Sequence, residues 1–277
     1  MSTVSELLRW ARGQLPGDEV DSDAQSLLSH VLQKNRTWLF TWGDQAVADK
    51  DEARFRDLVA QRAAGHPVAY LTGNRAFWTL DLQVDQHTLI PRPETEHLVE
   101  KALQLGPANK PLEILDLGTG SGAIALALAS ERPAWQVTAC DRSKPALQVA
   151  KANAERLGLN NVQLIHSDWF KAIEGHFDLV ISNPPYIPNQ DPHLSQGDLR
   201  FEPVGALASG SDGLDDIRHI VSEAQQYLKR GGWLLLEHGY DQGEATRQIL
   251  QQHGFKQVFT DADLASRDRL SGGKLPT

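Results

Sequence analysis

Cysteine is nearly absent from this chain of 277 residues, which contains only Cys140. A single cysteine excludes an internal disulfide and a thiolate-rich metal site, and its place at the end of a predicted buried strand favours a small core residue. The ten histidines show no His-x-x-x-His spacing, and there is no Cys-x-x-Cys pair. Because these spacings are typical of zinc sites, the sequence predicts no metal site.

Long apolar runs and clusters of basic residues are missing too. No stretch approaches the roughly eighteen apolar residues that a membrane span needs, and the first residues lack the basic and then apolar pattern of a secretion signal. Lys and Arg number 27 against 36 Asp and Glu, a formal net charge of −9 at pH 7. Binding of nucleic acid without a separate recognition domain needs phosphate-binding Lys and Arg, although a fold can gather dispersed arginines on one face. We therefore expect a cytoplasmic protein with no membrane and no direct nucleic acid among its partners.

Hydrophobic periodicity divides the chain into a helical part and an α/β part. Apolar residues recur at helical spacing in the first quarter of the chain, and these runs end at stop signals such as Pro16-Gly17 and Gly65-His-Pro67. The pattern predicts a small helical bundle over 1–75, a hairpin and proline-rich linker over 76–95, and an α/β domain over 96–277. Strand and helix patterns alternate in the α/β domain, which predicts a doubly wound, mostly parallel sheet.

Three local predictions concern the segments around this sheet. Alternating apolar residues predict a strand over Phe77–Asp85, as part of a hairpin. A helix through Ile217–Ala224 is expected to continue to Lys229–Gly232, because basic residues in a last turn suit the helix dipole. A strand over Trp233–Leu236 is expected to follow.

A glycine-rich turn follows the first predicted strand of the α/β domain. Glu113–Leu117 runs into three glycines at alternating positions, and a helical run begins at Ala123. The spacing differs from the G-x-G-x-x-G pattern of dinucleotide-binding turns. Glycines allow a tight turn and close approach of a ligand, and the helix amino terminus adds N–H donors. The residues predicted here to bind a cofactor are Gly118, Thr119, Gly120, Ser121 and Gly122.

Carboxylates follow the next two predicted strands. Asp141 comes about twenty residues after the glycine turn, where a carboxylate can accept both hydroxyls of a ribose. Asp168 could accept from an adenine amino group, and Trp169 could pack on the purine face. The alternative for Asp141 is a solvated carboxylate that caps the next helix, and Asp168 and Trp169 have the same kind of structural alternative.

The segment Asn183-Pro184-Pro185-Tyr186 follows a short apolar run that predicts a buried strand. Open α/β sheets place their active sites at the ends of parallel strands. The prolines fix φ near −65° and remove two N–H donors, so nearby carbonyls remain as acceptors. The Asn183 amide oxygen and the Pro184 carbonyl can therefore both accept from one planar NH2 group, while the Tyr186 ring can cover a flat π-system. The alternative is a proline-stiffened turn after a strand.

These features in this order resemble the class I S-adenosylmethionine-dependent methyltransferases, and the Asn-Pro-Pro-Tyr segment resembles their amino-methylating branch. More narrowly, the chain resembles the HemK family of glutamine methyltransferases that modify bacterial peptide chain release factors. The segments that carry the closer match are Phe77-Trp78, Leu89–Glu96, Ile114–Ala125, Ser182–Ile187, Arg200–Pro203 and Leu236–Gly239. One departure is Arg269–Lys274 (Arg-Leu-Ser-Gly-Gly-Lys), where the family usually has an Arg-Val-Thr-Gly-Arg-like strand.

The resemblance implies the rest of the fold and the activity. It implies seven strands with one antiparallel edge strand, and methyl transfer from S-adenosylmethionine to the side-chain amide nitrogen (N5) of the glutamine in the Gly-Gly-Gln motif of release factors 1 and 2. It also places the proline-rich segment around Arg92 over the cofactor, beside the substrate pocket. The helical bundle is expected to dock the release factor, because a flexible loop substrate needs contacts that hold its parent protein. We expect the enzyme to act as a monomer.

The predicted site divides by role. The predicted catalytic residues are Asn183, Pro184 and Tyr186, and Asn183 is also predicted to bind the cofactor. These three residues, Pro185 and Arg92 form the predicted substrate-binding set. The sequence shows no dedicated general base, and the roles of Arg200 and Glu202 stay open. Three alternatives also remain open, namely glutamine methylation of ribosomal protein L3, amino-group methylation of a nucleobase in DNA or RNA, and a cofactor-binding protein without turnover.

Overall fold

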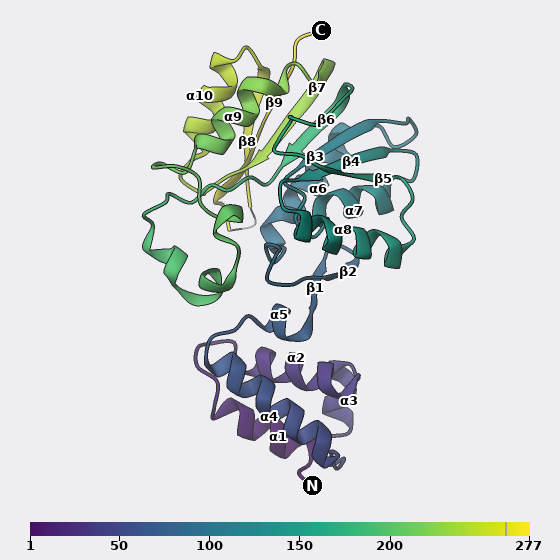
Figure 1. The fold of residues 1–277 in the computed structure, drawn as a ribbon, viewed down its shortest axis with the longest axis vertical. Coiled ribbons are helices and arrows are strands. Elements are labelled where there is room, and N and C mark those ends of the chain that lie inside the picture. Colours follow the sequence, from purple (N-terminus) through teal and green to yellow (C-terminus); the bar gives the residue numbers. More distant parts are fainter. Residues whose placement is uncertain (264) are drawn as a thin grey trace. The chain divides into compact units, whose positions relative to one another are not determined.

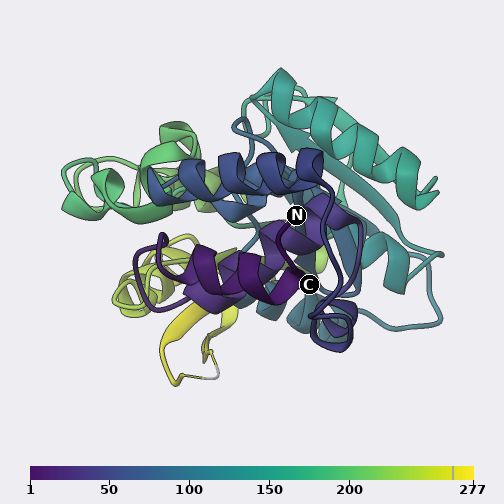
Figure 2. The same ribbon diagram turned by 90° about the horizontal axis from the view of Figure 1, so that it is seen from below.

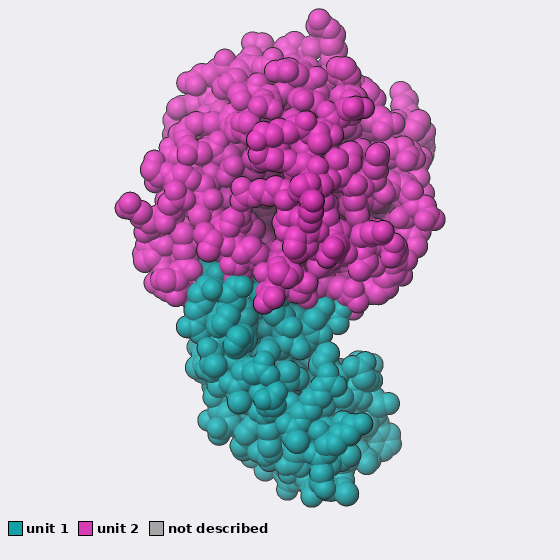
Figure 3. Space-filling view, in the orientation of Figure 1, with its two compact units in different colours: residues 1–74, 197–201 teal, residues 75–196, 202–277 magenta. Residues whose placement is uncertain are grey.

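The computed structural model describes residues 1–263 and 265–277, which form two compact units. The first unit comprises Met1–Asn74 together with Gly197–Phe201, and the second comprises Arg75–Gln196 and Glu202–Thr277 (Figure 3). The hairpin and the proline-rich segment over 76–95 therefore lie within the second unit. In the described part of the chain, no helix combines the length and apolar character needed to cross a membrane.

The first unit is a small bundle of helices around an apolar core. A capping box at Thr3 and Glu6 begins the first helix, since the Thr3 side chain accepts from the Glu6 amide and the Glu6 side chain accepts from the Thr3 amide. Leu7, Leu27 and Phe55 are fully buried in the core between the helices. The purple to blue helices run beside one another in Figure 2. They are α1 (Val4–Arg12), α2 (Val20–Leu32), α3 (Arg36–Thr41), α4 (Asp49–Ala63) and α5 (Val68–Thr72).

The segment η3 (Gly197–Phe201) belongs to this helical unit although it comes from late in the sequence. Arg62 of α4 donates from Nε to Asp23 Oδ2 at 2.7 Å and from Nη1 to Asp198 Oδ1 at 2.8 Å. Arg200 donates to a backbone carbonyl at the end of α4 at 2.9 Å. The bond to the end of α4 gives Arg200, whose role the sequence left open, a structural role within the helical unit.

The second unit is built on a seven-stranded sheet in the order β5-β4-β3-β6-β7-β9-β8 (Figure 1). The strands are β3 (Glu113–Leu117), β4 (Gln136–Asp141), β5 (Val162–His166), β6 (Phe177–Ser182), β7 (Leu228–Glu237), β8 (Lys256–Ala262) and β9 (Asp268–Lys274). Neighbouring strands from β5 to β7 are parallel, and β9 is antiparallel to both of its neighbours. The doubly wound, mostly parallel sheet is confirmed. The antiparallel strand, however, lies one position inside the edge, because β8 pairs outside it.

Helices cover both faces of the sheet and bury its alternating side chains. Ile114 of β3 lies in the core beneath α6 and α7, whereas Leu115 and Leu117 lie in the core beneath α9 and α10. Full burial of such a side chain contributes about 1.5–3 kcal/mol, so these two cores hold the sheet rigid under the site. The helices are α6 (Glu96–Leu105), α7 (Ala123–Glu131), α8 (Lys144–Leu157), α9 (Asp215–Ala224) and α10 (Gly243–Gln252).

The segment Ser271–Lys274 is part of β9, where the sequence departs from the family pattern. A Cβ atom at Gly272 would lie 2.8 Å from Leu235 and Phe259 side-chain atoms, and one at Gly273 would lie 2.9 Å from Phe255. The two glycines therefore allow bulky neighbours to pack against the strand backbone.

Two of the local predictions are wrong in detail. The strand expected over Phe77–Asp85 is divided into β1 (Asn74–Phe77) and β2 (Leu80–Gln83), with a turn between them at which Trp78 has a φ of 56°. Trp78 donates from its backbone to Glu96 Oε1 and from its indole to Glu131 Oε1, at 2.8 and 2.7 Å. These tertiary bonds hold a conformation that a bulky residue rarely adopts.

The second correction concerns the segment after α9. The helix ends at Ala224, and β7 already begins at Leu228, so Lys229–Gly232 lies in a strand. Leu228 pairs with Phe177 of β6, and Lys229 Nζ donates to Asp178 Oδ2 at 2.7 Å. Lys229 thus pairs with a carboxylate of the neighbouring strand and does not lie in the last turn of a helix.

Candidate active site

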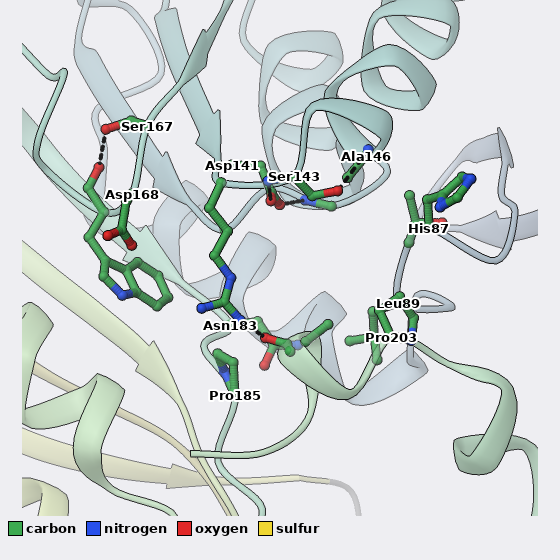
Figure 4. Close-up of a pocket in the computed structure, with 17 residues that line it drawn as sticks. His87, Leu89, Asp141, Ser143, Ala146, Ser167, Asp168, Asn183, Pro185 and Pro203 are labelled. Carbon is green, nitrogen blue, oxygen red and sulfur yellow. Dashed lines mark hydrogen bonds between the residues drawn. The ribbon is translucent and has the colours of Figure 1, made fainter. Parts of the chain in front are cut away.

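A pocket lies at the carboxyl ends of strands β3, β4, β5 and β6 (Figure 4). Because these strands are parallel, the residues that follow them meet at one edge of the sheet, where the chain order reverses between β3 and β6. The pocket collects residues from each predicted segment, namely Gly118 and Gly120 after β3, Asp141 of β4, Asp168 and Trp169 after β5, and Asn183 and Pro185 after β6.

The glycine turn leaves room for a ligand in the pocket. Gly118 and Gly120 have φ values of 73° and 57°, which glycine adopts readily. A Cβ atom at Gly120 would meet no described heavy atom within 4 Å. Since Gly120 also lines the pocket, the missing side chain leaves room for a ligand against the backbone.

The other residues of the turn support it from beneath. Thr119 and Ser121 are buried and Gly122 stands at the start of α7, and none of these three lines the pocket. Thr119 Oγ1 donates to Asp116 Oδ2 at 2.6 Å, and Ser121 accepts from a side chain of α8 through its backbone carbonyl at 2.9 Å. Thr119 through its side chain and Ser121 through its backbone therefore support the turn from outside the pocket.

Asp141 combines the two roles that the sequence left as alternatives. Its Oδ1 accepts from the Ser143 amide at 2.8 Å, next to the start of α8, and its Oδ2 accepts from the Gly120 amide at 2.9 Å. Each carboxylate oxygen has a second lone pair, so the group can still accept ribose hydroxyls from the pocket that it lines. Asp141 thereby ties the glycine turn to the end of β4.

Trp169 has an unusual backbone that carries its indole to the pocket. Its φ of 50° is rare for a bulky residue, and the Ser167 hydroxyl donates to its carbonyl at 2.7 Å. A Cβ atom at Gly118 would lie 3.5 Å from the Trp169 ring. Asp168 pairs with Lys171, and this hydrogen bond holds the pKa of Asp168 below its usual value, so a charged acceptor lies beside the indole.

Asn183 is held by a side chain from the start of α6. Its Nδ2 donates to Thr95 Oγ1 at 3.1 Å, which leaves Oδ1 to accept from a ligand in the pocket. Pro184 and Pro185 are buried, and Pro185 also lines the pocket. Asn183 therefore offers one acceptor of the predicted pair to the pocket, whereas Pro184, whose carbonyl is the other, is not among the lining residues.

Tyr186 is not among the residues that line the pocket. Its hydroxyl donates to Glu237 Oε1 at 3.4 Å, and its carbonyl accepts from Gln242 at 2.9 Å. Burial and the charge of Glu237 raise the pKa of Tyr186, so the phenol stays protonated. The structure thus places Tyr186 beside the Asn183 support, and the pocket lining does not include it.

Arg92 is engaged in an ion pair outside the pocket lining. It pairs with Glu202 Oε1, while Glu202 Oε2 accepts from the Ile90 amide at 3.2 Å. The Glu202 side chain is fully buried in this arrangement. The pair joins the two segments that were most specific to the family resemblance, and it gives Glu202 the role of anchoring the proline-rich segment.

Several pocket residues were not predicted from the sequence. They come from the segment after β2, from the segment between β4 and the first turn of α8, from the residue after β5, and from Pro203 and the short helix η4 (Val204–Ala206). They are His87, Thr88, Leu89, Arg142, Ser143, Ala146, Ser167, Pro203, Gly205 and Ala206. Arg142 donates to the Gly205 carbonyl, which links two of these segments. Their only sequence signal is proximity to a predicted motif, as for Ser143 beside Asp141. In the described residues, no group of three or more potential metal ligands occurs.

Two buried carboxyl groups underlie the site. Burial raises the pKa of both Asp116 and Glu237 to about 7, with hydrogen bonds from Thr119 and Thr95, respectively, opposing the rise. Cys140 is buried at the end of β4, and burial likewise raises the pKa of its thiol to about 12. The prediction that Cys140 is a core residue is confirmed.

The strand order with an antiparallel β9, and the glycine turn beside Asp141 at the switch point, define a class I S-adenosylmethionine-dependent methyltransferase. A solved methyltransferase from Pyrococcus furiosus has the same fold, with a TM-score of 0.55 and 18% identity over 80% of this chain and 98% of that one. Residues 95–197 match the model of the methyltransferase small domain, and residues 6–73 match that of the PrmC N-terminal domain.

Curated relatives narrow the class to one family. The chain is 54% identical over 255 residues to the release factor glutamine methyltransferase of Xylella fastidiosa, covering 92% of this chain and 93% of the relative. It is 51% identical over 276 residues to that of Pseudomonas aeruginosa, covering 99% of both chains. The chain belongs to the release factor glutamine methyltransferase family, which confirms the resemblance found in the sequence.

Proposed function

We propose that this chain transfers a methyl group from S-adenosylmethionine to N5 of the glutamine side chain in the Gly-Gly-Gln motif of release factors 1 and 2. Family membership supports the substrate, and the orientation of Asn183 is the observation that carries the chemistry. Because its Nδ2 is engaged by Thr95, its Oδ1 is left as an acceptor that suits the NH2 group of a glutamine amide.

The pocket lining fits the cofactor. The Gly118 and Gly120 backbone leaves room for the ligand, Asp141 offers acceptors for the ribose, and Trp169 offers a flat apolar surface beside Asp168 for the purine. When bound, S-adenosylmethionine supplies an electrophilic methyl group on a good leaving group. No strong base is then needed before attack.

The acceptor pair would act on the nucleophile. A carboxamide nitrogen attacks poorly because its lone pair is delocalised into its carbonyl, and positive charge develops on it during transfer. Asn183 Oδ1 and the Pro184 carbonyl accept from its two N–H groups, and both bonds strengthen as that charge grows. Positioning of the nitrogen about 3–3.5 Å from the methyl carbon supplies most of the remaining acceleration, and the extra proton leaves to water.

The helical unit would hold the parent protein. The loop that carries the glutamine offers few contacts, so the binding energy must come from surfaces remote from the reacting atoms. We place the enzyme in the cytoplasm as a monomer that meets its release factor without nucleic acid or membrane. The net charge of −9 supports a protein partner over a nucleic acid.

A side-by-side methylation assay tests this function. Tritiated methyl transfer should be fast on release factor and near background on ribosomal protein L3, DNA and RNA, with the methyl group on the Gly-Gly-Gln glutamine by mass spectrometry. Release factor with alanine in place of that glutamine is the matched control and should accept no label. Faster transfer to the ribosomal protein or to a nucleic acid would overturn the assignment.

A further inference from the structure

Glu237 is a buried carboxyl group that the proposed reaction does not yet use. It is the last residue of β7 and is 2% exposed. Oε1 accepts from the Tyr186 hydroxyl, whereas Oε2 has no hydrogen-bond partner among the described residues. Burial of an incompletely paired carboxyl group opposes folding, so its presence next to the site calls for a role.

The register of the sheet brings Glu237 beside Asn183. In the parallel pair β6 and β7, Ser182 lies opposite Leu236, so Asn183 and Glu237 follow paired positions. Thr95 enters from η1 (Pro93–Thr95) and is 4% exposed. Its Oγ1 accepts from Asn183 Nδ2 at 3.1 Å, and the Thr95 hydroxyl lowers the pKa of the neighbouring Glu237 carboxyl group.

The donors and acceptors of this chain of groups allow one arrangement. A carboxylate only accepts, so Thr95 gives its single proton to Glu237 and must accept from Asn183. The Asn183 carboxamide is then fixed with Nδ2 towards Thr95 and Oδ1 towards the substrate. We infer that Glu237 and Thr95 are positioning residues that lock this orientation, so that the site selects a carboxamide NH2 over a carboxylate of the same shape. The inference rests on the proposed function.

The charge of Glu237 controls the orientation of the Asn183 carboxamide. The groups that face it are Thr95, Tyr186, Arg269 and Glu94. Burial raises the pKa of Glu237 to about 7, Thr95 and Arg269 oppose the rise, and the charge of Glu94 adds to it.

A protonated Glu237 can donate, which frees the Thr95 proton for Asn183 Oδ1. The turned carboxamide would then present Nδ2 to the substrate, and two donors would face each other. We therefore expect kcat to fall as the pH drops through about 7.

A matched pair of variants tests the lock in the full chain. Thr95→Val keeps the shape but removes the hydroxyl, and kcat on release factor should fall about 10- to 100-fold, as for a misplaced reacting group. Thr95→Ser restores the hydroxyl and should recover most of the activity. Calorimetry should show unchanged S-adenosylmethionine affinity for both, which confirms that each variant is folded.

Two further readouts separate positioning from a merely structural role. Release factor with glutamate in place of the Gly-Gly-Gln glutamine should compete weakly against the wild type, and Thr95→Val should narrow the preference for the glutamine form. Glu237→Gln mimics the protonated state, so its kcat should be low at pH 8 and nearly constant through pH 7.

The outcomes distinguish the two proposals. A wild type that does not methylate release factor overturns the proposed function, and the inference with it. An active wild type with equal kcat values for Thr95→Val and Thr95→Ser, or with an unchanged preference for glutamine in Thr95→Val, overturns the inference alone.

Discussion

Asn183 illustrates how a single residue depends on its neighbours. The side chain offers a donor and an acceptor of nearly the same shape, and the bond from Nδ2 to Thr95 decides which of them remains for a substrate. The same amide on an exposed loop would rotate freely and select nothing.

Removal of this acceptor should reduce turnover far more than cofactor binding. We expect Asn183→Ala to lower kcat on saturating release factor by about 10² to 10³, by analogy with loss of one oxyanion-hole donor, because the bond strengthens towards the transition state. S-adenosylmethionine affinity should change much less. Asn109→Ala, at an exposed position before β3, is the control and should behave as the wild type. Near-normal turnover of Asn183→Ala would contradict the assignment.

Asp116 should leave a signature in the pH dependence of stability. It is fully buried with Oδ1 unpaired among the described residues, and burial raises its pKa to about 7. The folded state therefore retains a proton that the unfolded state releases near pH 4, so its contribution is complete below about pH 4 and is lost as the pH rises through about 7. Glu237 acts in the same direction.

We expect the free energy of unfolding to decrease over this pH window. Each group contributes a slope of up to about 1.4 kcal/mol per pH unit. Asp116→Asn should remove the contribution of Asp116 to this slope. When the free energy of unfolding is measured with urea at several pH values, it should therefore change less with pH in the variant than in the wild type. Parallel curves for the two proteins would show that Asp116 does not titrate in this range.

Among the structural elements, the turn after β3 and the end of β4 act as one unit. The Gly118 and Thr119 amides donate to the Cys140 carbonyl at 2.9 Å, and the Gly120 amide donates to Asp141. A turn that must approach a ligand closely is thus held from the neighbouring strand.

Loss of the Asp141 carboxylate should weaken cofactor binding. Asp141→Ala removes acceptors for the ribose and the anchor of Gly120, and a hydrogen bond to a charged group contributes about 1.5–3 kcal/mol. S-adenosylmethionine affinity by calorimetry should fall by a factor of about 10 to 100. Asp44→Ala, at an exposed position of the helical unit, should leave the affinity unchanged. An unchanged affinity in Asp141→Ala would reduce Asp141 to a helix cap.

In the whole molecule, neither unit is one continuous stretch of chain. The helical unit contains Gly197–Phe201, while Glu202, the next residue, belongs to the second unit and anchors Arg92. The chain that follows Asn183 therefore contributes to both units. A release factor held by the helical unit could gain affinity from surfaces that a short peptide never reaches.

The docking role can be separated from the chemistry by the size of the substrate. A chain of residues 75–277 should bind S-adenosylmethionine, because the glycine turn and Asp141 are intact, and this binding is measured first. Its rate on full-length release factor should fall at least about tenfold, since remote contacts are lost, while the poor rate on a short Gly-Gly-Gln peptide should stay nearly the same. Full activity on intact release factor would show that the helices are an appendage.

Local rules were enough to predict much of this protein. Positive φ values at Gly118 and Gly120, the stiff Asn183–Tyr186 segment and the burial of apolar residues at regular spacing depend on residues close together in sequence, so the α/β class and most candidate site residues could be predicted. The match of Leu89–Glu96 and Arg200–Pro203 to one family identified the class of substrate.

Tertiary structure decided the features that depend on distant partners. Pairing with Phe177 begins β7 at Leu228, and β9 inserts between β7 and β8, although no local propensity specifies either register. The ion pair of Arg92 with Glu202 joins residues 110 positions apart, and the bond from Asn183 to Thr95 spans 88. Such contacts form only when the whole sheet assembles, because burial then leaves each polar group with few partners within reach.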